Sequence, residues 1–545
     1  MQAKKTFLPQ PEWIIAILIT TAAVLLHLHF WLHIGGLWRD EVNQVSISGR
    51  HSFAEMAKDS FPILMPLTVH TWAAAGLART DLGLRTLGLL VGLGILAALW
   101  ISNWKIRRAP PLLGLALFGL NSSLIFFGDS IRAYGLGSLF AAALTATAFY
   151  FVQKPSTARA VCLGLLAILS VQVLYNNVVL VAAVCFGAWV VCWRHQDKRA
   201  ALQILLVATV SAASLLPYTQ SLIASAGFSD ILRSGVKLPR FFASYTDTLG
   251  YPLSGYIWIW ILLYAAIVFL AVAGSPRTQD LQKNENVISN DDLNLFAAVA
   301  IIIAAVGFPV FFWRAQLPMQ SWYVLSFMAL VAVCFDATLA AFRGLIRVVF
   351  LAFVAVTACI SIPTTAKLLN AAHFSSVDIY AQALMANAAP KDYIIVEPWL
   401  FGITFNYYFK GTTPWDTLPP IADHSTHRFD LVQQQLKNTN AMAPVFQQIT
   451  QTLQSGHRVW ILADAGWMGV PNPGSHPPAS LPPAPLPDTG WSDRPYTLVW
   501  ASQTACFLSD HSDFVQVKSL SADRFITENV QLFTASGWKT NALAR

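Results

Sequence analysis

The stretch WIIAILITTAAVLLHLHFWL, residues Trp13–Leu32, decides the fold class of this 545-residue chain. A helix of about 20 apolar residues is long enough to cross the hydrocarbon core of a bilayer. Lys4 and Lys5 precede the stretch, as basic residues precede a signal peptide. However, the apolar run is long and no small-residue cleavage site follows it. We therefore expect residues 13–32 to form a retained membrane helix.

The composition extends this prediction to most of the chain. Hydrophobic side chains make up 55% of the residues and charged ones 12%, about half the charge content of a soluble protein. A soluble chain of this length would need several domains with charged surfaces, so an ordinary soluble enzyme is excluded. The six cysteines show no disulfide or zinc-binding pattern. Apolar runs predict about eleven spans, near 13–32, 83–101, 111–127, 133–152, 159–175, 178–193, 202–220, 253–273, 295–313, 320–340 and 345–363.

The charges of the loops predict the orientation. Residues 1–366 carry 24 basic and 15 acidic side chains, whereas residues 367–545 carry 11 and 13. With a cytoplasmic N-terminus, almost every short inner loop is basic, which is the positive-inside pattern. The net charge of +7 therefore reflects membrane topology, and we expect no nucleic-acid partner. An odd number of spans places everything after about residue 363 outside.

Residues 367–545 have the character of a small α/β domain. Asp392–Val396 and Arg458–Leu462 are short β-rich runs of the kind that form buried strands. Residues 381–389 and 432–455 favour helices, and the proline-rich residues 471–495 favour a loop. The predicted fold is thus mainly α: a polytopic membrane helix bundle over residues 1–366, including a long outer loop at 33–82, followed by an extracytoplasmic α/β domain over 367–545.

The segment LWRDEV, residues Leu37–Val42, follows the first span directly. Its adjacent acids Asp40 and Glu41 lie within a few residues of the predicted bilayer surface, where charges are costly unless they have partners or a function. A carboxylate at this position could accept a proton from an attacking hydroxyl or amine, or help to bind a metal ion. A solvated loop pair is the alternative for this dipeptide taken alone.

Further motifs follow in order on the predicted outer side. They are SFPILMPL at residues 60–67, then His70 and Trp72, DLGLRTLGLLVG at 81–92, and NSSLIFFGDSIRAYGL at 121–136. With the acidic pair, this series resembles the bacterial polyprenyl-phosphate-dependent membrane glycosyltransferases. That family includes the protein O-mannosyltransferases and the aminoarabinose transferases, and it has the C-type glycosyltransferase fold.

The resemblance implies a reaction and a location. The expected donor is a sugar on a polyprenyl phosphate, delivered from the surrounding membrane lipids, and the acceptor is a glycolipid, a polysaccharide or a protein. The expected location is a bacterial inner membrane, with the N-terminus in the cytoplasm and the C-terminal domain in the periplasm. Transfer is expected to invert the anomeric carbon, with Asp40 as the general base and Glu41 in an orienting or metal-binding role.

The sequence departs from the family pattern at two positions. Phe61-Pro62-Ile63 stands where the family commonly has His-Pro-Pro, and Ser130 stands two residues before Arg132, where a Glu is frequent. Asp129 is one residue further back, and we expect it to take over the role of that Glu in catalysis. No cofactor follows from the residues, and a divalent metal on Asp40 and Glu41 stays an open expectation.

A lipid-phosphate leaving group needs cationic or N–H donors as its charge grows. We expect Arg132 and Tyr134, at the outer end of a span, to meet the donor phosphate. Ion pairing with Asp129 is the alternative for Arg132. His70 is a further assisting candidate, although a packing role is more common at such a position, and Arg85 is interpreted as a residue that extends to the membrane surface. The other outer basic cluster is Arg233, Lys237 and Arg240 in the second long outer loop. We expect it to help bind the donor phosphate, with headgroup binding or plain solvation as an equal alternative.

Two other classes of protein stay open. A transporter or flippase would place ionisable residues in the middle of the membrane and would have repeated halves, whereas the predicted spans are almost free of charge. A ligase or polymerase of O-antigen would carry its decisive residues in one large late outer loop, whereas here the strongest motif is in the first. If the transferase hypothesis holds, Asp40, Asp129 and Arg132 are expected to share one cavity at the outer face.

Overall fold

The computed structural model describes residues 10–50, 52–57, 61–226, 238–273, 289–317, 319–339, 344–464, 466, 469–471, 480–484, 491–517, 519–520 and 524–539. The chain divides into two compact units. One is a helical bundle of residues 1–32, 52–219 and 236–370, and the other, here called the C-terminal unit, comprises 33–51, 220–235 and 371–545. The expected outer loop 33–82 is therefore divided: its first part, which carries Asp40 and Glu41, groups with the C-terminal unit.

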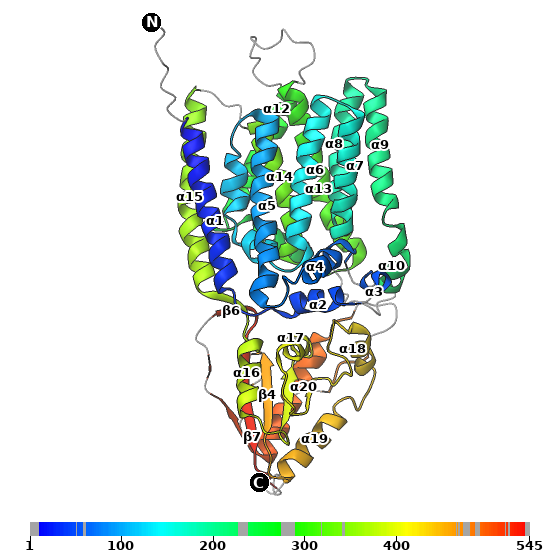
Figure 1. Cartoon of the computed structure of the whole chain (residues 1–545), viewed down its shortest axis with the longest axis vertical. Coiled ribbons are helices and arrows are strands. Elements are labelled where there is room, and N and C mark those ends of the chain that lie inside the picture. Colours follow the sequence, from blue (N-terminus) through cyan, green and yellow to red (C-terminus); the bar gives the residue numbers. More distant parts are fainter. Residues whose placement is uncertain are drawn as a thin grey trace. The chain divides into compact units, whose positions relative to one another are not determined.

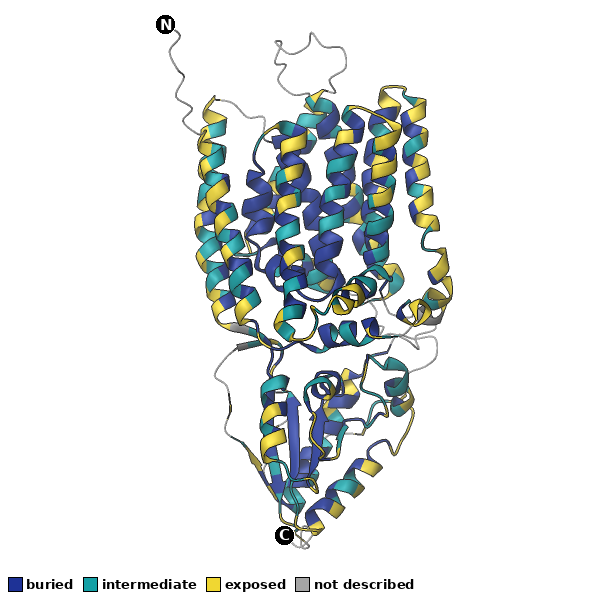
Figure 2. Cartoon of the chain, viewed as in Figure 1, coloured by how far each residue is buried: buried dark blue, intermediate teal, exposed yellow. Residues whose placement is uncertain are grey.

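The bundle is built from long apolar helices that run side by side (Figure 1). Within the described residues, nine helices are long and apolar enough to cross a membrane, so the chain is a multi-span membrane protein. Their lipid-facing sides carry exposed large apolar residues such as Leu202, Leu205 and Leu206 of α9 (Figure 2). The helices of the bundle are α1 (Pro11–His33), α5 (Asp81–Arg107), α6 (Ala133–Gln153), α7 (Thr157–Val173), α8 (Asn177–Arg194), α9 (Lys198–Ala213), α12 (Tyr256–Ala273), α13 (Asn290–Ala315), α14 (Leu325–Leu339) and α15 (Gly344–Asn370).

Two of the eleven predicted spans differ from a long helix. The run at 159–175 is the 17-residue helix α7, which is shorter than the nine candidate spans. Two of those spans join consecutive helices, namely Lys198–Ile223, in which α9 continues through η3 into α10, and Ser321–Leu339, in which η4 precedes α14. The run at 111–127 is broken into two π-helical pieces, η1 (Gly114–Gly119) and η2 (Leu124–Gly128). Its N-terminus is capped from another helix, because Asp336 of α14 accepts the N–H groups of Leu113 and Gly114 at 2.8 and 2.9 Å.

Shorter helices complete the bundle. The apolar segment after the SFPILMPL motif is helical from Leu64 to Ala74, and residues 75–78 form a turn. The charged end of α5 contacts both α14 and α13, since Arg107 donates to the carbonyl of Ala337 and to the side chain of Asn290. The short helices of the bundle are α3 (Phe53–Met56), α4 (Leu64–Ala74), η3 (Leu216–Tyr218), α11 (Leu238–Leu249) and η4 (Ser321–Val324). A further short helix, α10 (Thr219–Ala226), groups with the C-terminal unit from residue 220 onward.

The C-terminal unit contains a five-stranded mixed sheet in the order β3-β2-β4-β7-β5. β2 (Tyr393–Glu397), β3 (Trp415–Thr417) and β4 (Val459–Asp464) are parallel, and β7 (Val530–Ser536) runs antiparallel to β4 and to β5 (Asp513–Gln516). β2 and β4 confirm the two strands predicted at 392–396 and 458–462. A second, two-stranded parallel sheet pairs β1 (Ala372–Ser375) with β6 (Arg524–Glu528).

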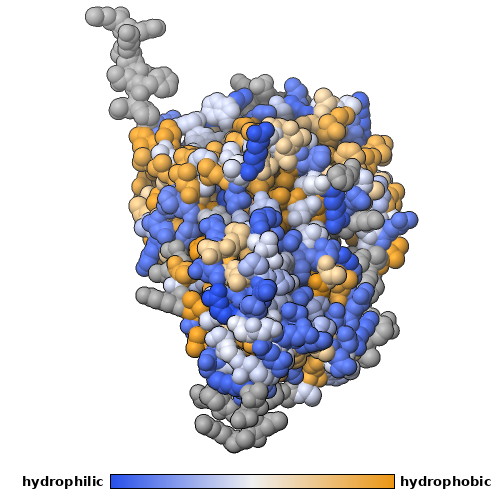
Figure 3. Space-filling model, turned by 60° about the horizontal axis from the view of Figure 1, so that its bottom comes forward, coloured by the Kyte–Doolittle hydropathy of each residue, from blue (hydrophilic) through white to orange (hydrophobic). Residues whose placement is uncertain are grey.

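Alternate residues of β2 and β4 enter two hydrophobic cores. Ile394 and Leu462 face α16 (Val377–Asn387) and α17 (Phe401–Tyr408), whereas Ile395 and Ile461 face α18 (Phe429–Leu436), α19 (Ala443–Gln454) and α20 (Arg494–His511). Because both faces of the central strands are covered, these strands read as continuous apolar runs. The predicted helix 432–455 is in fact two helices, α18 and α19. Hydrophilic side chains gather over the C-terminal unit and hydrophobic ones over the bundle (Figure 3).

Candidate active site

The acidic pair lies in the first turn of α2 (Arg39–Ser48), a helix of the C-terminal unit. Acidic side chains are favoured there because the helix dipole makes the N-terminal turn electropositive. The N–H of Leu37 donates to the hydroxyl of Tyr408 at 2.6 Å, and the ring of Trp38 packs against Phe374 at a centroid distance of 5.8 Å. The start of α2 is therefore fixed against α17 and β1 of the same unit.

Asp40 contacts two cationic or donor groups through one oxygen. Its Oδ1 is 3.2 Å from Nε2 of His427 and 3.7 Å from Nε of Arg39. The side chains of Asp40 and His427 are each 16% exposed, so the pair is partly accessible. Asn43 reinforces the arrangement one turn later, because its Oδ1 accepts the main-chain N–H of His427 at 2.9 Å. The Asp40 carboxylate is thus oriented by neighbours of the same unit and stays partly accessible.

Glu41 faces a different environment from its neighbour. Its side chain is completely buried, and its Oε2 accepts the N–H of Trp38 at 3.4 Å, which caps the N-terminus of α2. Consecutive residues of a helix point in different directions, so Asp40 and Glu41 do not act as one pair. Glu41 thus caps α2, and its orienting or metal-binding role in the reaction stays a prediction.

A second acid that the sequence did not single out lies beside Asp40. Glu528, at the end of β6, is completely buried; it accepts the N–H of Arg39 at 3.0 Å and the hydroxyls of Ser375 and Thr404 at 2.6 and 3.0 Å. Burial raises the pKa of Glu528 to about 7, and the positive charge of Arg39 opposes this shift. Arg39 is thus placed between the Asp40 and Glu528 carboxyl groups.

A separate polar cluster lies inside the bundle. Nδ1 of His27 in α1 is 2.7 Å from Oδ2 of Asp129, and both side chains are almost fully buried. Arg85 of α5 is 3% exposed and interacts electrostatically with Asp129. The interpretation of Arg85 as a residue that extends to the membrane surface is therefore wrong, since its charge has a partner in the interior.

Glycines of α5 make room for this cluster. A Cβ atom at Gly92 would lie 2.0 Å from Oδ1 of Asp129 and 2.8 Å from Nδ1 of His27, and one at Gly88 would lie 1.8 Å from the carbonyl oxygen of Asp129. Real atoms do not approach so closely, so the turn at Asp129 can contact α5 only where α5 has no side chains. The glycine spacing in residues 81–92 thus has a structural cause.

Arg132 and Tyr134 lie together at the start of α6. The guanidinium carbon of Arg132 is 4.6 Å from the ring centroid of Phe61 and 5.7 Å from that of Tyr134. The ring of Tyr134 also contacts Trp322 and Tyr323, at 6.1 and 5.7 Å. Arg132 is buried and occupies the N-cap position of α6, where the free N–H groups of the first turn favour an anion.

The remaining predicted site residues are exposed or lie outside the described residues. Arg240 is exposed in the first turn of α11, and His70 is exposed on α4. Arg233 and Lys237 lie outside the described residues. Asp40 belongs to the C-terminal unit, whereas Asp129 and Arg132 belong to the bundle, so the expectation that all three share one cavity stays a prediction.

Few side chains near Asp40 and Glu41 could serve as ligands of a divalent metal ion. In the described part of the chain, no three His, Cys, Asp or Glu side chains come together in a way that would hold a metal ion. Asp40 contacts His427, and Glu41 caps a helix. Hard cations such as Mg²⁺ and Ca²⁺ prefer about six or more oxygen ligands. The residues around Asp40 do not fit such an ion, and no reaction step is assigned to a metal.

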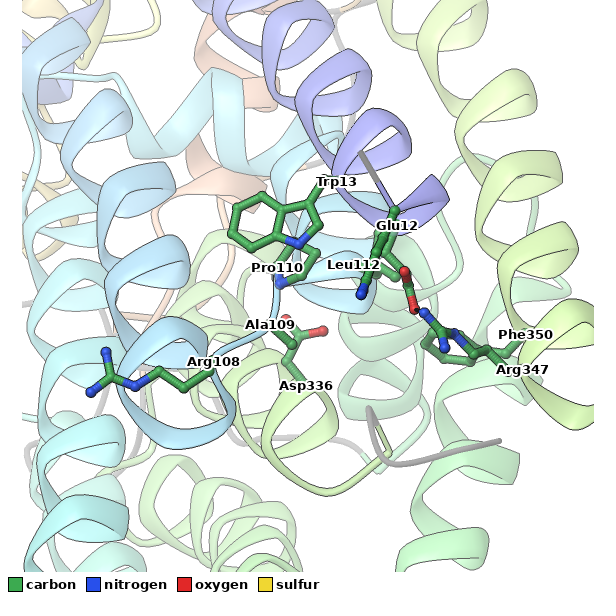
Figure 4. Close-up of a pocket in the computed structure, with 10 residues that line it drawn as sticks. Glu12, Trp13, Arg108, Ala109, Pro110, Leu112, Asp336, Arg347 and Phe350 are labelled. Carbon is green, nitrogen blue, oxygen red and sulfur yellow. Dashed lines mark ion pairs between the residues drawn. The ribbon is translucent and has the colours of Figure 1, made fainter. Parts of the chain in front are cut away.

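A cavity of about 70 Å³ lies among the start of α1, the segment that follows α5 and the start of α15 (Figure 4). Its lining includes Glu12 and Arg347, which form an ion pair, and Asp336, which caps η1. The charges that line it are thus largely engaged within the protein. None of the predicted site residues contributes to this cavity. Its lining residues are Gln10, Glu12, Trp13, Arg108, Ala109, Pro110, Leu112, Asp336, Arg347 and Phe350.

No protein-family model matches the sequence, and a search of curated proteins gives no match. Among solved structures, the chain is similar to ArnT from Cupriavidus metallidurans bound to undecaprenyl phosphate, with 13% identity over 84% of this chain and 94% of that one and a TM-score of 0.48. It is also similar to the oligosaccharyltransferase of Archaeoglobus fulgidus in complex with Zn and sulfate, with 9% identity over 94% of this chain and 73% of that one and a TM-score of 0.47.

A further structure of the archaeal enzyme, AglB with an inhibitory peptide and a dolichol phosphate, is 11% identical over 82% of this chain and 69% of that one, with a TM-score of 0.41. ArnT and AglB are polyprenyl-phosphate-dependent glycosyltransferases, the class that the sequence motifs resemble. At these identities and TM-scores the likeness is one of general chain arrangement. The roles proposed below therefore rest on the residues of this chain.

Three residues with polar contacts were not predicted as site residues. His427 and Glu528 lie far from Asp40 in the sequence, and no local motif marks them. His27 is an ionisable residue inside a membrane helix, which is a signal of function by default. Its partner Asp129 lies 102 positions away in the sequence, so no local pattern marks the pair.

Proposed function

We propose that the chain is a membrane glycosyltransferase that moves a sugar from a polyprenyl-phosphate donor to an acceptor at the outer face of the membrane. The observation that carries the proposal is the position of Asp40 and the contacts of its carboxylate. Asp40 is a partly exposed carboxylate, located shortly after the first membrane helix and held through Oδ1 by His427 and Arg39. The order of the motifs around it, from LWRDEV to the Arg132-Ala133-Tyr134 sequence, supports the same reaction.

In the proposed step, a hydroxyl of the acceptor attacks the anomeric carbon of the donor sugar from the face opposite the phosphate. The bond between this carbon and the phosphate oxygen breaks, and its electron pair leaves with the polyprenyl phosphate. Asp40 accepts the hydroxyl proton as the new glycosidic bond forms, and the anomeric configuration is inverted. A positioned general base of this kind contributes about 10²- to 10⁴-fold to the rate.

Arg132 is proposed to stabilise the leaving phosphate. Its guanidinium lies against Phe61 and Tyr134 at the N-terminus of α6. A fixed cation next to free helix N–H groups favours the charge that grows on the phosphate during transfer. The aromatic rings around it limit the access of water, which makes the charge interaction stronger than it would be in solvent.

The proposal is tested by comparing the glycolipids and envelope glycans of a deletion strain with those of the same strain carrying the intact gene. Mass spectrometry of both fractions is expected to reveal a glycan or lipid that gains the mass of one sugar only when the gene is present. A variant with Asp40→Asn is expected to resemble the deletion, although the protein still inserts into the membrane. Identical glycan profiles with and without the gene would contradict the proposed function.

A transporter or flippase of lipid-linked sugars is the second candidate. The observation that favours it is the buried cluster of His27, Arg85 and Asp129 next to the broken segment η1–η2, because ionisable residues beside interrupted helices are typical of transporters. The two functions differ in their products. A transferase releases free polyprenyl phosphate, whereas a flippase leaves the lipid-linked sugar intact.

A further inference from the structure

We propose that His427 is the positioning residue for the general base Asp40, so that the C-terminal unit supplies part of the reaction centre. This inference rests on the proposed function, because it assumes that Asp40 accepts the proton of the acceptor. The contact that carries it joins Nε2 of His427 to Oδ1 of Asp40 at 3.2 Å. The two residues lie 387 positions apart in the sequence, yet both belong to the C-terminal unit.

His427 is held by two further contacts, one of its main chain and one of its ring. Its main-chain N–H donates to Oδ1 of Asn43, on the same helix as Asp40, at 2.9 Å. Its ring stacks on that of Phe429 with a centroid distance of 5.4 Å and an interplanar angle of 8°. The ring therefore has little freedom to rotate, and its donor atom stays directed at Asp40. A preorganised donor of this kind fixes the carboxylate without a conformational change during the reaction.

The two ring nitrogens have different surroundings, which decides between positioning and proton transfer. In the tautomer with its proton on Nε2, the ring donates to Asp40. Nδ1 is buried, and it has no hydrogen-bond partner in the described part of the chain. A proton relay needs an acceptor on the far side of the ring, and Nδ1 offers no onward path of this kind among the described residues. His427 is therefore assigned to orient Asp40 rather than to carry its proton onward.

Two donors act on the same oxygen of Asp40, since both His427 and Arg39 contact Oδ1. Loss of the His427 donor would let the carboxylate rotate, and a misplacement of about 1 Å can lower a rate by roughly 10²-fold. A purely structural role, by contrast, would change the amount of folded protein and leave the rate of each folded molecule unaltered.

The experiment uses the full-length purified protein in detergent, with a membrane lipid extract from the deletion strain as the source of donor and acceptor. The release of polyprenyl phosphate is measured by liquid chromatography and mass spectrometry. His427→Leu is expected to lower kcat by about 10²-fold without changing KM for the donor. His427→Gln offers an N–H near the position of Nε2 and is expected to return kcat to within about tenfold of the wild type.

Two controls separate positioning from a loss of structure. His457→Leu replaces a partly exposed histidine of the same unit and is expected to leave kcat unchanged. The double variant Asp40→Asn/His427→Leu is expected to be no slower than Asp40→Asn alone, since residues that act as a unit are not additive. Equal thermal unfolding midpoints of wild type and His427→Gln would show that any change in rate is not a folding defect.

Three results would overturn the inference: a normal kcat for His427→Leu, a kcat for His427→Gln as low as that of His427→Leu, or full additivity with Asp40→Asn. If His427→Leu fails to fold, the kcat of His427→Gln, compared with those of the wild type and of Asp40→Asn, still tests the positioning role of His427. A wild-type protein that releases no polyprenyl phosphate would instead contradict the proposed function, so the two failures are distinguishable.

Discussion

Asp40 and Asp129 are both acids paired with a histidine, but their surroundings differ. Asp40 is 16% exposed and contacts His427 through a single oxygen at 3.2 Å. Asp129 is 2% exposed, forms a shorter contact of 2.7 Å with His27, and lies against the glycines of α5. One carboxylate is accessible to a reacting molecule, whereas the other is enclosed by the helices that it joins.

A histidine–carboxylate pair can therefore serve two purposes in one chain. A buried pair in a bundle fixes which helices meet, and removal of one partner leaves an uncompensated group in the interior. A partly exposed pair at the start of a helix can take up a proton. We therefore propose that Asp40 reacts and that Asp129, which the sequence marked as a catalytic candidate, positions the turn that leads to Arg132.

The largest expected effect separates the two acids directly. Asp40→Asn should lower the rate of transfer per folded molecule by about 10²- to 10⁴-fold, because the variant cannot accept the proton. Asp129→Asn should instead reduce the yield of folded protein and leave most of the rate per folded molecule. Glu55→Gln, at an exposed acid of α3, is the matched control. The measurement is the rate of transfer normalised to the monodisperse fraction in size-exclusion chromatography. Equal losses of this rate for Asp40→Asn and Asp129→Asn would contradict the different roles proposed for the two acids.

The second effect concerns stability. His27→Leu should lower the free energy of unfolding by about 3–5 kcal/mol, since it removes the hydrogen-bonding partner of the buried Asp129 carboxylate. The double variant His27→Leu/Asp129→Leu should recover none of this loss, because the buried Arg85 then lacks the acid with which it interacts. Unfolding in mixed detergent, followed by tryptophan fluorescence, measures both. A single variant as stable as the wild type would mean that the pair does not hold α1 in the bundle.

The third prediction uses the pH dependence of the C-terminal unit. Burial raises the pKa of Glu528 from 4.5 to about 7, so the folded protein keeps this proton over a range in which the unfolded chain has lost it. The contribution is complete below pH 4.5 and is lost as the pH rises to about 7. It amounts to roughly 3 kcal/mol at most. Thermal unfolding from pH 4.5 to 7.5 should show a fall in the stability of the wild type that Glu528→Gln lacks. Parallel pH–stability curves of the two proteins would contradict the raised pKa of Glu528.

The smallest effect tests the glycine contact in the bundle. Gly92→Ala should destabilise the protein by about 1–3 kcal/mol, because its Cβ would overlap the carboxylate of Asp129. Gly94→Ala, two residues on in the same helix, would make only ordinary contact with Leu139 at 3.5 Å. It should be neutral or stabilising by up to about 1 kcal/mol. Thermal midpoints of the two variants in one detergent provide the comparison, and equal midpoints would contradict the proposed role of Gly92.

Much of the fold could be predicted because hydropathy and charge act locally. The apolar runs give nine long helices among the described residues, and the β-rich runs at 392–396 and 458–462 form the central strands. The run at 111–127 was predicted as one helix because hydropathy does not distinguish an α-helix from two π-helical pieces. At the break, Thr365 donates to the carbonyl of Leu120 and Asn121 donates to that of Thr248, and both partners come from distant parts of the chain.

The candidate site was only partly predictable for the same reason. Asp40 and Arg132 belong to motifs, so their residue types and order mark them. His427 and Glu528 reach α2 from distant parts of the chain, and only the folded C-terminal unit brings them there. Arg85 was misjudged because a charge near a helix end resembles one that extends to the headgroups, and its interior partner Asp129 is far away in sequence.

The release of polyprenyl phosphate tests the central claim most directly. Purified wild-type protein and Asp40→Asn are incubated with the same lipid extract of the deletion strain, and free polyprenyl phosphate is quantified by mass spectrometry over time. A transferase with Asp40 as its base predicts steady release by the wild type and a rate about 10²- to 10⁴-fold lower for the variant. Equal release by both proteins, or no release by the wild type, would contradict it.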